Sequence, residues 1–583
     1  MSDEATAGPV IGPAPDAFDV VIVGGGSSGC VLANRLSADP RRRVLLIEAG
    51  RDIKPGEEAP AMLDIYPGRV AFDPVNHWPA LPAYFRPVAH NAAERPPLGR
   101  YEQPRLMGGG SSINGQVANR GTPDDYDEWE RLGATGWNWQ SVLPYFKKLE
   151  RDLDYGGPLH GDSGPIPIHR VPRERWPAFS LAAEAALEEA GFPALGDQNG
   201  RFEDGHFPMT LSNDGVHRVS TARAYLDRET RQRPNLVVMA NTSVSGLAWD
   251  GRRVVGVQLR AADGVMRSIG ARETIVAAGA IHSPALLMKS GIGPAPDLHR
   301  LGVTLVHDLP GVGRNLQEHP GISLSAYLAR AARLRGTTRR HIHLGLRYSS
   351  GSAEGMPSDM YMMVVAKSAW HPLGRQIATL LSWINKPYAR GSVTLQGADP
   401  AMPPLAAFNH LADIRDVTRL TASVRFMARL LACETLAGHV AHASPSRYSG
   451  FAKALGRYSL RNFLITAPAA VALDALPFLR APFFRHFVAG GMSLADLLAS
   501  DEAIAAYVRD NAFGQWHACG TCRMGSAGDR EAVTDPASGR VHGVSGLRVI
   551  DASVMPTAPR ANLNIPVIML AERLADAILA TGD

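Results

Sequence analysis

Three glycines and one acidic residue near the N-terminus have the types and spacing that bind a dinucleotide. Gly24, Gly26 and Gly29 form a G-x-G-x-x-G motif. The first glycine permits a tight turn, the second lets a pyrophosphate approach the backbone, and the third lets helix and strand pack closely. Glu48 lies nineteen residues after Gly29 and can accept two hydrogen bonds from a ribose. We expect these residues, with Ser28 in the turn, to contact the cofactor.

The elements that must position this motif occur in the order strand, helix, strand. Residues 18–23 form a continuous apolar run, which is typical of a strand buried on both faces. Residues 30–36 have the apolar spacing of a helix, and residues 43–48 form a second strand that ends in the acid. The N-terminus of the helix then faces the phosphates. This order distinguishes the motif from an isolated glycine-rich turn.

The fingerprint alone does not separate NAD from FAD. A second glycine cluster at residues 107–114 offers backbone N–H groups and hydroxyls to a further part of a long cofactor, and we expect contacts from Gly109, Ser111 and Asn114. Several distant strands end in Gly or Asp, which suggests one sheet assembled from separated segments around an extended cofactor such as FAD. The contacts expected from these segments are Val244, Ala278 and Asp551.

Composition excludes several classes of protein. The chain has 583 residues, 45% of them hydrophobic, and a net charge of +4, which argues against disorder and against nucleic acid as a partner. Four cysteines cannot form a disulfide framework, and we interpret Cys519 and Cys522 as packing residues, with no metal site. We expect residues 1–17 to form a loose tail, and their composition does not predict a signal peptide. No apolar window has the length of a transmembrane segment, so we expect a cytoplasmic protein.

The chain resembles the glucose-methanol-choline (GMC) flavoprotein oxidoreductases. The resemblance runs from about residue 18 to the end and is carried by the first glycine motif and by residues 108–114, 279–293, 517–521 and 551–556. Residues 125–129 and 160–165 are further similar to the bacterial 5-hydroxymethylfurfural oxidase branch. The resemblance implies FAD, an alcohol oxidised to a carbonyl, and O2 or another acceptor. Ile113 stands where several relatives carry a histidine that binds flavin covalently, so we expect non-covalent FAD.

Alcohol oxidation through a flavin needs a base for the hydroxyl proton and transfer of a hydride to flavin N5. Of nineteen histidines, His517 is the candidate base, because the small residues after it allow close approach to a flat ring. A lone histidine is more often a core residue, but the position of His517 in the family favours the base. The resemblance also makes Asn562 a hydrogen-bond donor to the substrate oxygen.

The final helix is expected to point its positive end toward the flavin. Asn564 is the predicted N-cap, although Asn562 could exchange with it, and Pro566 suits the first turn. Both Asn564 and Pro566 are therefore predicted cofactor contacts. A helix N-terminus there would stabilise the anionic reduced flavin.

The predicted fold is α/β, with a discontinuous Rossmann-like FAD-binding domain and a substrate domain built on an antiparallel sheet flanked by helices. The FAD-binding domain comprises residues 18–160, 213–317 and 533–583, and the substrate domain comprises residues 161–212 and 318–532.

The substrate domain supplies the predicted pocket. Residues 359–365 and 391–395 are expected in its antiparallel sheet, and residues 411–433 form a long helix. An aromatic and apolar pocket for a flat substrate is predicted from Gln515, Trp516, Tyr361, Met363, Trp383 and Phe513. The apolar stretch 464–492 is interpreted as a lid or as a subunit contact, for example in a homodimer, with a membrane-surface patch as a third reading.

Three functional hypotheses follow. The first is FAD-dependent oxidation of a primary aryl or furan alcohol to the aldehyde. The second is a different chemistry on the same fold, either an aliphatic or choline-like alcohol dehydrogenase or a light-driven fatty-acid decarboxylase. The third is flavin binding without turnover, against which the presence of both His517 and Asn562 argues.

Overall fold

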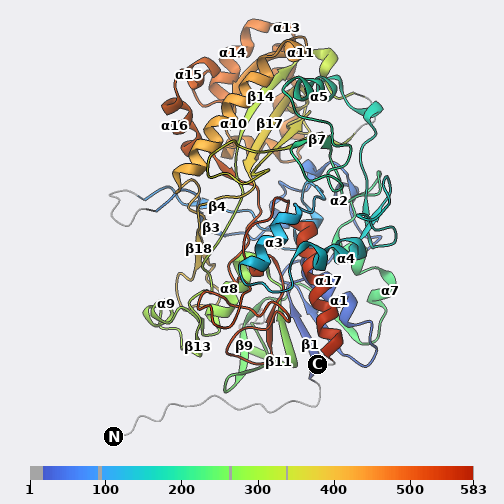
Figure 1. The fold of residues 1–583 in the computed structure, drawn as a ribbon, viewed down its shortest axis with the longest axis vertical. Coiled ribbons are helices and arrows are strands. Elements are labelled where there is room, and N and C mark those ends of the chain that lie inside the picture. Colours follow the sequence, from blue (N-terminus) through green and yellow to red (C-terminus); the bar gives the residue numbers. More distant parts are fainter. Residues whose placement is uncertain (1–16, 89–94, 261–265, 336–338, 582–583) are drawn as a thin grey trace.

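The structure is a computed structural model that describes residues 17–88, 95–260, 266–335 and 339–581 (Figure 1). The expected tail at residues 1–17 lies outside the described residues except for Ala17. Two large sheets lie one above the other along the long axis of the molecule, with β1 (Phe18–Val23) and the C-terminal end of α17 (Asn564–Thr581) toward the lower end of Figure 1. The α/β fold class predicted from the sequence is confirmed.

The first sheet has a parallel core. Its order is β8-β2-β1-β11, and β22 pairs with β11 as well. Apolar β-branched residues and leucines dominate its central strands β1 and β2, which are buried because helices cover the sheet. The bounds are β1 (Phe18–Val23), β2 (Val44–Ile47), β8 (Leu236–Met239), β11 (Met266–Val276), β22 (Leu547–Val549), α1 (Ser27–Leu36), α6 (Thr221–Tyr225), α8 (Gly279–Lys289) and α17 (Asn564–Thr581).

Strand β11 pairs in parallel with one neighbour and antiparallel with another. Its second half runs parallel to β1, whereas its first half pairs antiparallel with β10 (Arg253–Arg260), which continues to β9 (Val244–Asp250). Strands that are distant in sequence thus end at one edge of the sheet, as predicted for an extended cofactor.

The second sheet is antiparallel throughout, in the order β20-β14-β17-β16-β15-β7, with β21 paired to β14. Its bounds are β7 (Gly205–Pro208), β14 (Pro320–Leu328), β15 (Ile342–Tyr348), β16 (Met360–Val365), β17 (Ile377–Ile384), β20 (Val440–Pro445) and β21 (Phe513–Gly514). One face packs against helices α5 (Ala178–Glu189), α10 (Ile414–Ala432) and α16 (Asp501–Asn511). The predicted antiparallel sheet flanked by helices is therefore present.

Alternation along β16 decides which side chains face the first sheet. Met360, Met362 and Val364 belong to the core beneath the helices, whereas Tyr361 and Met363 face the opposite way. This period of two is the geometry of a pleated strand.

The structure corrects the expected place of residues 391–395 and leaves the domain boundaries untested. Residues 391–395 do form a strand, β18 (Ser392–Thr394), but it belongs to a separate sheet with β19 (Leu405–Ala407), β3 (Pro82–Tyr84) and β4 (Gly99–Arg100), because β18 pairs with β19 rather than with the large antiparallel sheet. The domain boundaries stay a prediction, although the strands of each large sheet fall within the segments assigned to it.

Smaller elements connect these layers. The helical ones are α2 (Pro60–Leu63), α3 (Pro123–Arg131), α4 (Trp139–Leu149), α7 (Arg228–Arg231), α9 (Ala295–Arg300), α11 (Glu434–Ala437) and α15 (Leu494–Leu498), and the short strands are β5 (Glu150–Asp152), β6 (Ile166–Ile168), β12 (Ile292–Gly293) and β13 (His307–Asp308). The 3₁₀ turns include η1 (Pro67–Arg69), η3 (Gly109–Ser112) and η9 (Ala552–Val554).

We name residues 450–488 the apolar hairpin, which comprises α12 (Gly450–Gly456), α13 (Leu460–Ala475), a short turn, α14 (Arg480–Phe483) and a π-helical turn, Phe484–Val488. Its helices α13 and α14 lie at the upper end of Figure 1. Across the described ranges, no single helix has the length and apolar composition to cross a membrane. By those two measures alone, Leu460–Ala475 and Pro477–Val488 would pass as a pair, bent by 118°.

Candidate active site

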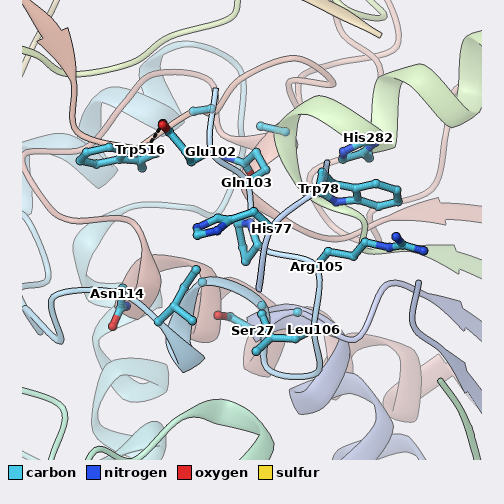
Figure 2. A pocket seen from close by; sticks show the side chains of 18 of the residues that line it. Ser27, His77, Trp78, Glu102, Gln103, Arg105, Leu106, Asn114, His282 and Trp516 are labelled. Atoms are coloured by element: carbon cyan, nitrogen blue, oxygen red, sulfur yellow. Dashed lines mark hydrogen bonds between the residues drawn. The ribbon is translucent and has the colours of Figure 1, made fainter. Parts of the chain in front are cut away.

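A cavity of about 1120 Å³ lies between the two large sheets. Its walls come from segments that are far apart in the sequence, and Figure 2 shows Ser27, Asn114 and Trp516 from three of them. The first glycine motif, the second glycine cluster, the segment at residues 515–518 and the residues before α17 all reach it.

The first glycine motif lies at the cavity, and its glycines have three different roles. Gly24 has a φ of +106°, and a Cβ there would lie 2.5 Å from the Ala277 carbonyl oxygen. A Cβ at Gly29 would lie 1.9 Å from the Gly24 carbonyl oxygen, so this glycine allows strand and helix to meet and does not itself line the cavity. A Cβ at Gly26 would meet nothing within 4 Å. The backbone at Gly26 therefore borders open space, as a pyrophosphate site requires.

Gly26→Ala is expected to weaken flavin dinucleotide binding about 10-fold or more without destabilising the apoprotein. The added methyl group touches no protein atom, but it fills the space beside the helix N-terminus, and overpacking of this kind costs about 1–3 kcal/mol. Flavin absorbance after gel filtration measures retention, and thermal unfolding of the apoprotein measures stability. Gly438→Ala is the matched control, since its Cβ also meets nothing within 4 Å and lies outside the cavity. Equal flavin retention by both variants would contradict the assignment.

Ser28 and Glu48 are held by the protein itself. The Ser28 hydroxyl donates to the Ile550 carbonyl, which ties α1 to the C-terminal segment. The two Glu48 carboxylate oxygens accept from Gly25 N at 2.8 Å and Gly50 N at 2.7 Å. Both residues line the cavity, and burial raises the pKa of Glu48 above its ordinary value. These contacts orient the carboxylate and leave its outer lone pairs for a ribose.

The second glycine cluster packs directly on the first. Gly109 has a φ of +51°, and a Cβ there would lie 2.9 Å from Gly26 Cα, so the two turns meet along bare backbone. Asn114 lines the cavity, and its Oδ1 accepts from Arg218 at 3.0 Å. The Ser111 hydroxyl instead donates to the Gly108 carbonyl at 2.5 Å and does not line the cavity. Ser111 therefore shapes the turn that presents Gly109.

Three more predicted contacts lie on the cavity wall, namely Val244, Ala278 and Asp551. The Asp551 carboxylate accepts from Gly279 N at 2.8 Å and from the Ser283 hydroxyl at 2.5 Å, so it caps the start of α8. Its burial raises its pKa. Asp551 thus joins the last strand of the first sheet to the helix after β11.

The start of α17 differs from the predicted capping. The helix begins at Asn564 itself, and the carbonyl of Leu563 accepts from Val567 N at 2.9 Å, so neither asparagine is the N-cap. Their amides have other partners: Asn564 Oδ1 accepts from the Ser27 hydroxyl at 2.7 Å, and Asn562 binds His517. Asn564 lines the cavity, whereas Pro566 lies behind it in the helix. The N-terminal end of α17 nevertheless lies at the cavity, as predicted.

His517 and Asn562 meet on the cavity wall. Asn562 Nδ2 lies 3.0 Å from His517 Nε2, and both residues line the cavity. Since the amide nitrogen is a donor, it keeps Nε2 unprotonated, and the ring proton then lies on Nδ1. The backbone of Asn562 is held by Asn119, whose Oδ1 accepts from Asn562 N at 2.8 Å.

Two residues that we did not select from the sequence position His517. His319 Nδ1 lies 2.9 Å from His517 Nδ1, where it can accept the ring proton of the tautomer described above. The buried carboxylate of Glu318 accepts from His517 N at 2.8 Å and from the Tyr101 hydroxyl at 2.6 Å. The sequence did offer a signal for these two residues, because Glu318 and His319 come directly before the strand that begins at Pro320.

Burial sets the charge state of this cluster. It lowers the pKa of His517 well below 6.5, with a smaller contribution from His319, and it lowers the pKa of His319 to about 3. Burial also raises the pKa of Glu318 to about 7. Both imidazoles are therefore neutral at neutral pH, which is the state that a base requires.

The predicted substrate pocket is only partly brought together. Gln515, Trp516 and Met363 line the cavity, whereas Tyr361, Trp383 and Phe513 do not. Tyr361 stacks on Trp383 with ring centroids 4.5 Å apart, and the Trp383 ring lies 6.5 Å from that of His517. The Trp383 ring therefore packs next to His517, and Tyr361 packs on Trp383.

Phe513 is covered because it stacks on Tyr448 at 4.9 Å, and Tyr448 takes the place on the cavity wall. Cys519 and Cys522 are free and buried, and burial raises the pKa of Cys519 to about 12. Such thiols are poor nucleophiles and poor metal ligands. A packing role is consistent with this environment.

A Rossmann-type sheet with a glycine cradle, joined to a buried imidazole and amide pair, is the architecture of a dinucleotide-dependent oxidoreductase. Two family models described as GMC oxidoreductase match residues 18–321 and 387–571. The chain belongs to the GMC oxidoreductase family.

Individual relatives cover nearly the whole chain. It is 46% identical to a 5-(hydroxymethyl)furfural oxidase of Methylovorus sp. (strain MP688), over 96% of this chain and 98% of that protein. It is 31% identical to an oxygen-dependent choline dehydrogenase of Vibrio vulnificus (strain YJ016), over 96% and 94% of the two chains. The solved structure of pyridoxine 4-oxidase from Mesorbium loti matches with a TM-score of 0.76 and 28% identity, over 97% and 99% of the two chains.

Proposed function

We propose that this protein uses FAD to oxidise a primary alcohol of the aryl or furan type to the aldehyde. The observation that carries the proposal is the pairing of His517 Nε2 with Asn562 Nδ2 at 3.0 Å on the wall of a cavity that also contains the glycine cradle. The similarity to a 5-(hydroxymethyl)furfural oxidase supports the substrate class.

The residues on the cavity wall fit FAD. Bare backbone at Gly26 borders open space beside the N-terminus of α1, and the oriented carboxylate of Glu48 lies where a ribose would follow. Bound FAD would supply the acceptor for a hydride at flavin N5 and pass the electron pair to O2 or another acceptor. Ile113 lines the cavity and has no nucleophilic atom, which supports non-covalent binding.

The chain's own residues perform the proton chemistry. A substrate hydroxyl placed between Asn562 and His517 donates its proton to His517 Nε2 and accepts a hydrogen bond from Asn562 Nδ2. As the alkoxide develops, the amide stabilises its negative charge. His517 then becomes an imidazolium, and His319 accepts the hydrogen bond from its Nδ1–H at 2.9 Å. The proton thus stays on His517 while the aldehyde forms.

The walls beside this pair favour a neutral, apolar substrate. Met363, Leu381 and Ile342 face the cavity from the antiparallel sheet, and Trp516 faces it from the segment of His517. The Glu102 carboxylate also lines the cavity, but it is paired with Lys453 at 2.7 Å, so its charge is compensated and gives little attraction to a quaternary ammonium group. Choline-like substrates are therefore the second candidate.

Anaerobic reduction of the bound flavin tests the proposal. The purified holoenzyme is mixed without oxygen with benzylic, furanic, aliphatic and choline substrates, and the loss of flavin absorbance is followed before air is admitted. Bleaching by the benzylic or furanic alcohols, with product aldehyde, is the expected result. Bleaching by choline or aliphatic alcohols alone would favour the second candidate. Bleaching by none, with carbon dioxide released from a fatty acid under blue light, would favour the decarboxylase.

The pH dependence of kcat/KM is expected to have its acid limb well below pH 6.5. The base acts when unprotonated, so activity is present above the pKa of His517 and falls about tenfold per pH unit below it. Because burial lowers that pKa, activity should persist at pH 6. An acid limb near pH 7 that disappears in Glu318→Gln would instead assign the titration to Glu318, whose pKa is raised to about 7.

Location and assembly stay predictions. The four thiols are free in the structure, which supports the proposed cytoplasmic location. The homodimer rests on the sequence expectation for residues 464–492, and sedimentation velocity would test it.

A further inference from the structure

The apolar hairpin exposes an unusual amount of apolar surface. Ten of the 21 large apolar side chains that are exposed in the described residues lie between residues 451 and 487. Scattered apolar residues are normal on a protein surface, whereas a contiguous group marks a site of interaction.

Helix α13 has polar side chains on its buried face and large apolar side chains on its exposed face. Its buried side includes Asn462 and Thr466, whereas Leu460, Leu464 and Val471 are 73%, 59% and 68% exposed. A surface helix of a soluble protein has the opposite arrangement. The Asn462 side chain is tied inside, since its Nδ2 donates to the Ala454 carbonyl at 2.8 Å and to the Arg457 carbonyl at 2.9 Å, at the end of α12. Among the residues that the structure describes, the outward face is therefore the one left uncovered.

The hairpin is fixed on the antiparallel sheet and cannot turn its apolar face inward without losing these contacts. Leu473 and Phe484 pack in one cluster with Tyr327 of β14. Asp474 accepts from the Tyr327 hydroxyl at 2.7 Å and pairs with Arg333 at 2.6 Å. The exposed side chains are thus held outward by a rigid base.

The charge of the hairpin is strongly one-sided. Residues 450–488 contain five cations and one acid, Asp474, which pairs with Arg333 outside this range. Two acids outside the range, Glu102 and Asp496, pair with Lys453 and Arg485, so an excess of positive charge remains. Arg457, Arg461 and Arg485 are exposed among the apolar side chains. This combination is complementary to an anionic apolar interface, because basic side chains bind lipid phosphates while neighbouring apolar groups enter the acyl boundary.

We propose that the apolar hairpin docks on a lipid bilayer that contains anionic phospholipids, with α13 lying in the plane of the headgroups. The 118° bend between its two helical parts suits contact with one leaflet. A second copy of the chain is a weaker occupant, because a twofold contact places each set of cations against an identical set. Lys453 of α12 and Arg457, which follows this helix, also line the cavity, so docking would hold one edge of the cavity beside the headgroups.

Cosedimentation of the holoenzyme with vesicles tests the proposal. We expect binding to vesicles of phosphatidylglycerol and phosphatidylcholine, weak binding to phosphatidylcholine alone, and release as salt rises. The combined substitutions Leu464→Ser, Val471→Ser and Phe478→Ser should lower the affinity about 100-fold or more, since each removes an exposed side chain that would be buried in lipid. Replacing Arg461 and Arg485 by Gln should lower it about 10-fold or more.

A matched triple variant separates the surface from general loss of apolar area. Leu98→Ser, Val216→Ser and Ile414→Ser change residues that are 56%, 62% and 63% exposed elsewhere, and this variant should bind vesicles like the wild type. Failure of the wild type to sediment, or equal binding by the two triple variants, overturns the proposal. A dimer that dissociates only in the hairpin variant makes a second copy the occupant and overturns it as well.

Discussion

His517→Ala is expected to slow anaerobic flavin reduction by the alcohol about 10²–10⁴-fold, the contribution typical of a positioned general base. Its Nε2 is the unprotonated nitrogen on the cavity wall, and burial keeps the ring neutral because it lowers the pKa well below 6.5. Without the imidazole, the hydroxyl proton must leave to water or to a weaker base. Stopped-flow measurement of flavin absorbance gives the rate directly.

Two observations make this result specific to His517. The variant should keep its bound flavin, because the His517 ring is hydrogen-bonded to His319 and Asn562 rather than to the glycine cradle, and added imidazole should restore part of the rate. His442→Ala provides the control, since His442 is a partly buried histidine in β20 that does not line the cavity. A reduction rate within threefold of the wild type in His517→Ala would place the base elsewhere.

Asn562→Ala is expected to lower kcat about 10²–10³-fold, as the loss of one donor to a developing oxyanion does. The amide hydrogen bond strengthens as the alkoxide charge develops, so kcat and kcat/KM should fall together rather than KM alone rising. Asn562 also holds His517 Nε2 at 3.0 Å, and its removal frees that nitrogen. Steady-state kinetics with the best alcohol of the panel measures both parameters.

A neighbouring asparagine supplies the control for Asn562. Asn564 lies two residues away on the same wall, but its Oδ1 accepts from Ser27 beside the first glycine motif. Asn564→Ala should therefore weaken flavin retention and leave the rate of reduction of the flavin-bound fraction close to normal. Asn562→His should recover part of the activity, because an imidazole N–H can also donate. If Asn562→Ala changed only KM, the amide would bind the substrate without stabilising its alkoxide.

Local patterns predicted the first two strands of the first sheet and the helix between them. The apolar run before Gly24 and the helix after it depend on neighbours in sequence, and the structure contains both as β1 and α1. Strand β16 was also recognisable, but its period of two could not show how far the cavity extends along it. Met363 therefore lines the cavity, whereas Tyr361 on the same face is covered by Trp383.

Capping preferences alone gave a wrong prediction for Asn564, namely that it is the N-cap of the final helix. An asparagine before an apolar helix is a good N-cap by propensity. In the structure its amide instead binds Ser27, which is 537 positions away in the sequence. Such a long-range partner outweighs a local preference and has no local signature.

The sequence by itself determined the βαβ cradle, because a short motif with the right flanking strands and helix is a local feature. The family resemblance, carried by several dispersed motifs, indicated FAD, and it supplied the roles predicted for His517 and Asn562. Only the tertiary structure decided which atoms meet. His319 reaches Nδ1 of His517 across 198 positions, and Glu318 holds the backbone of the same residue. The structure also decided that Leu464 and Val471 face outward from the hairpin. Periodicity finds an apolar face, but the packing of the whole chain determines whether that face is buried or left for a partner.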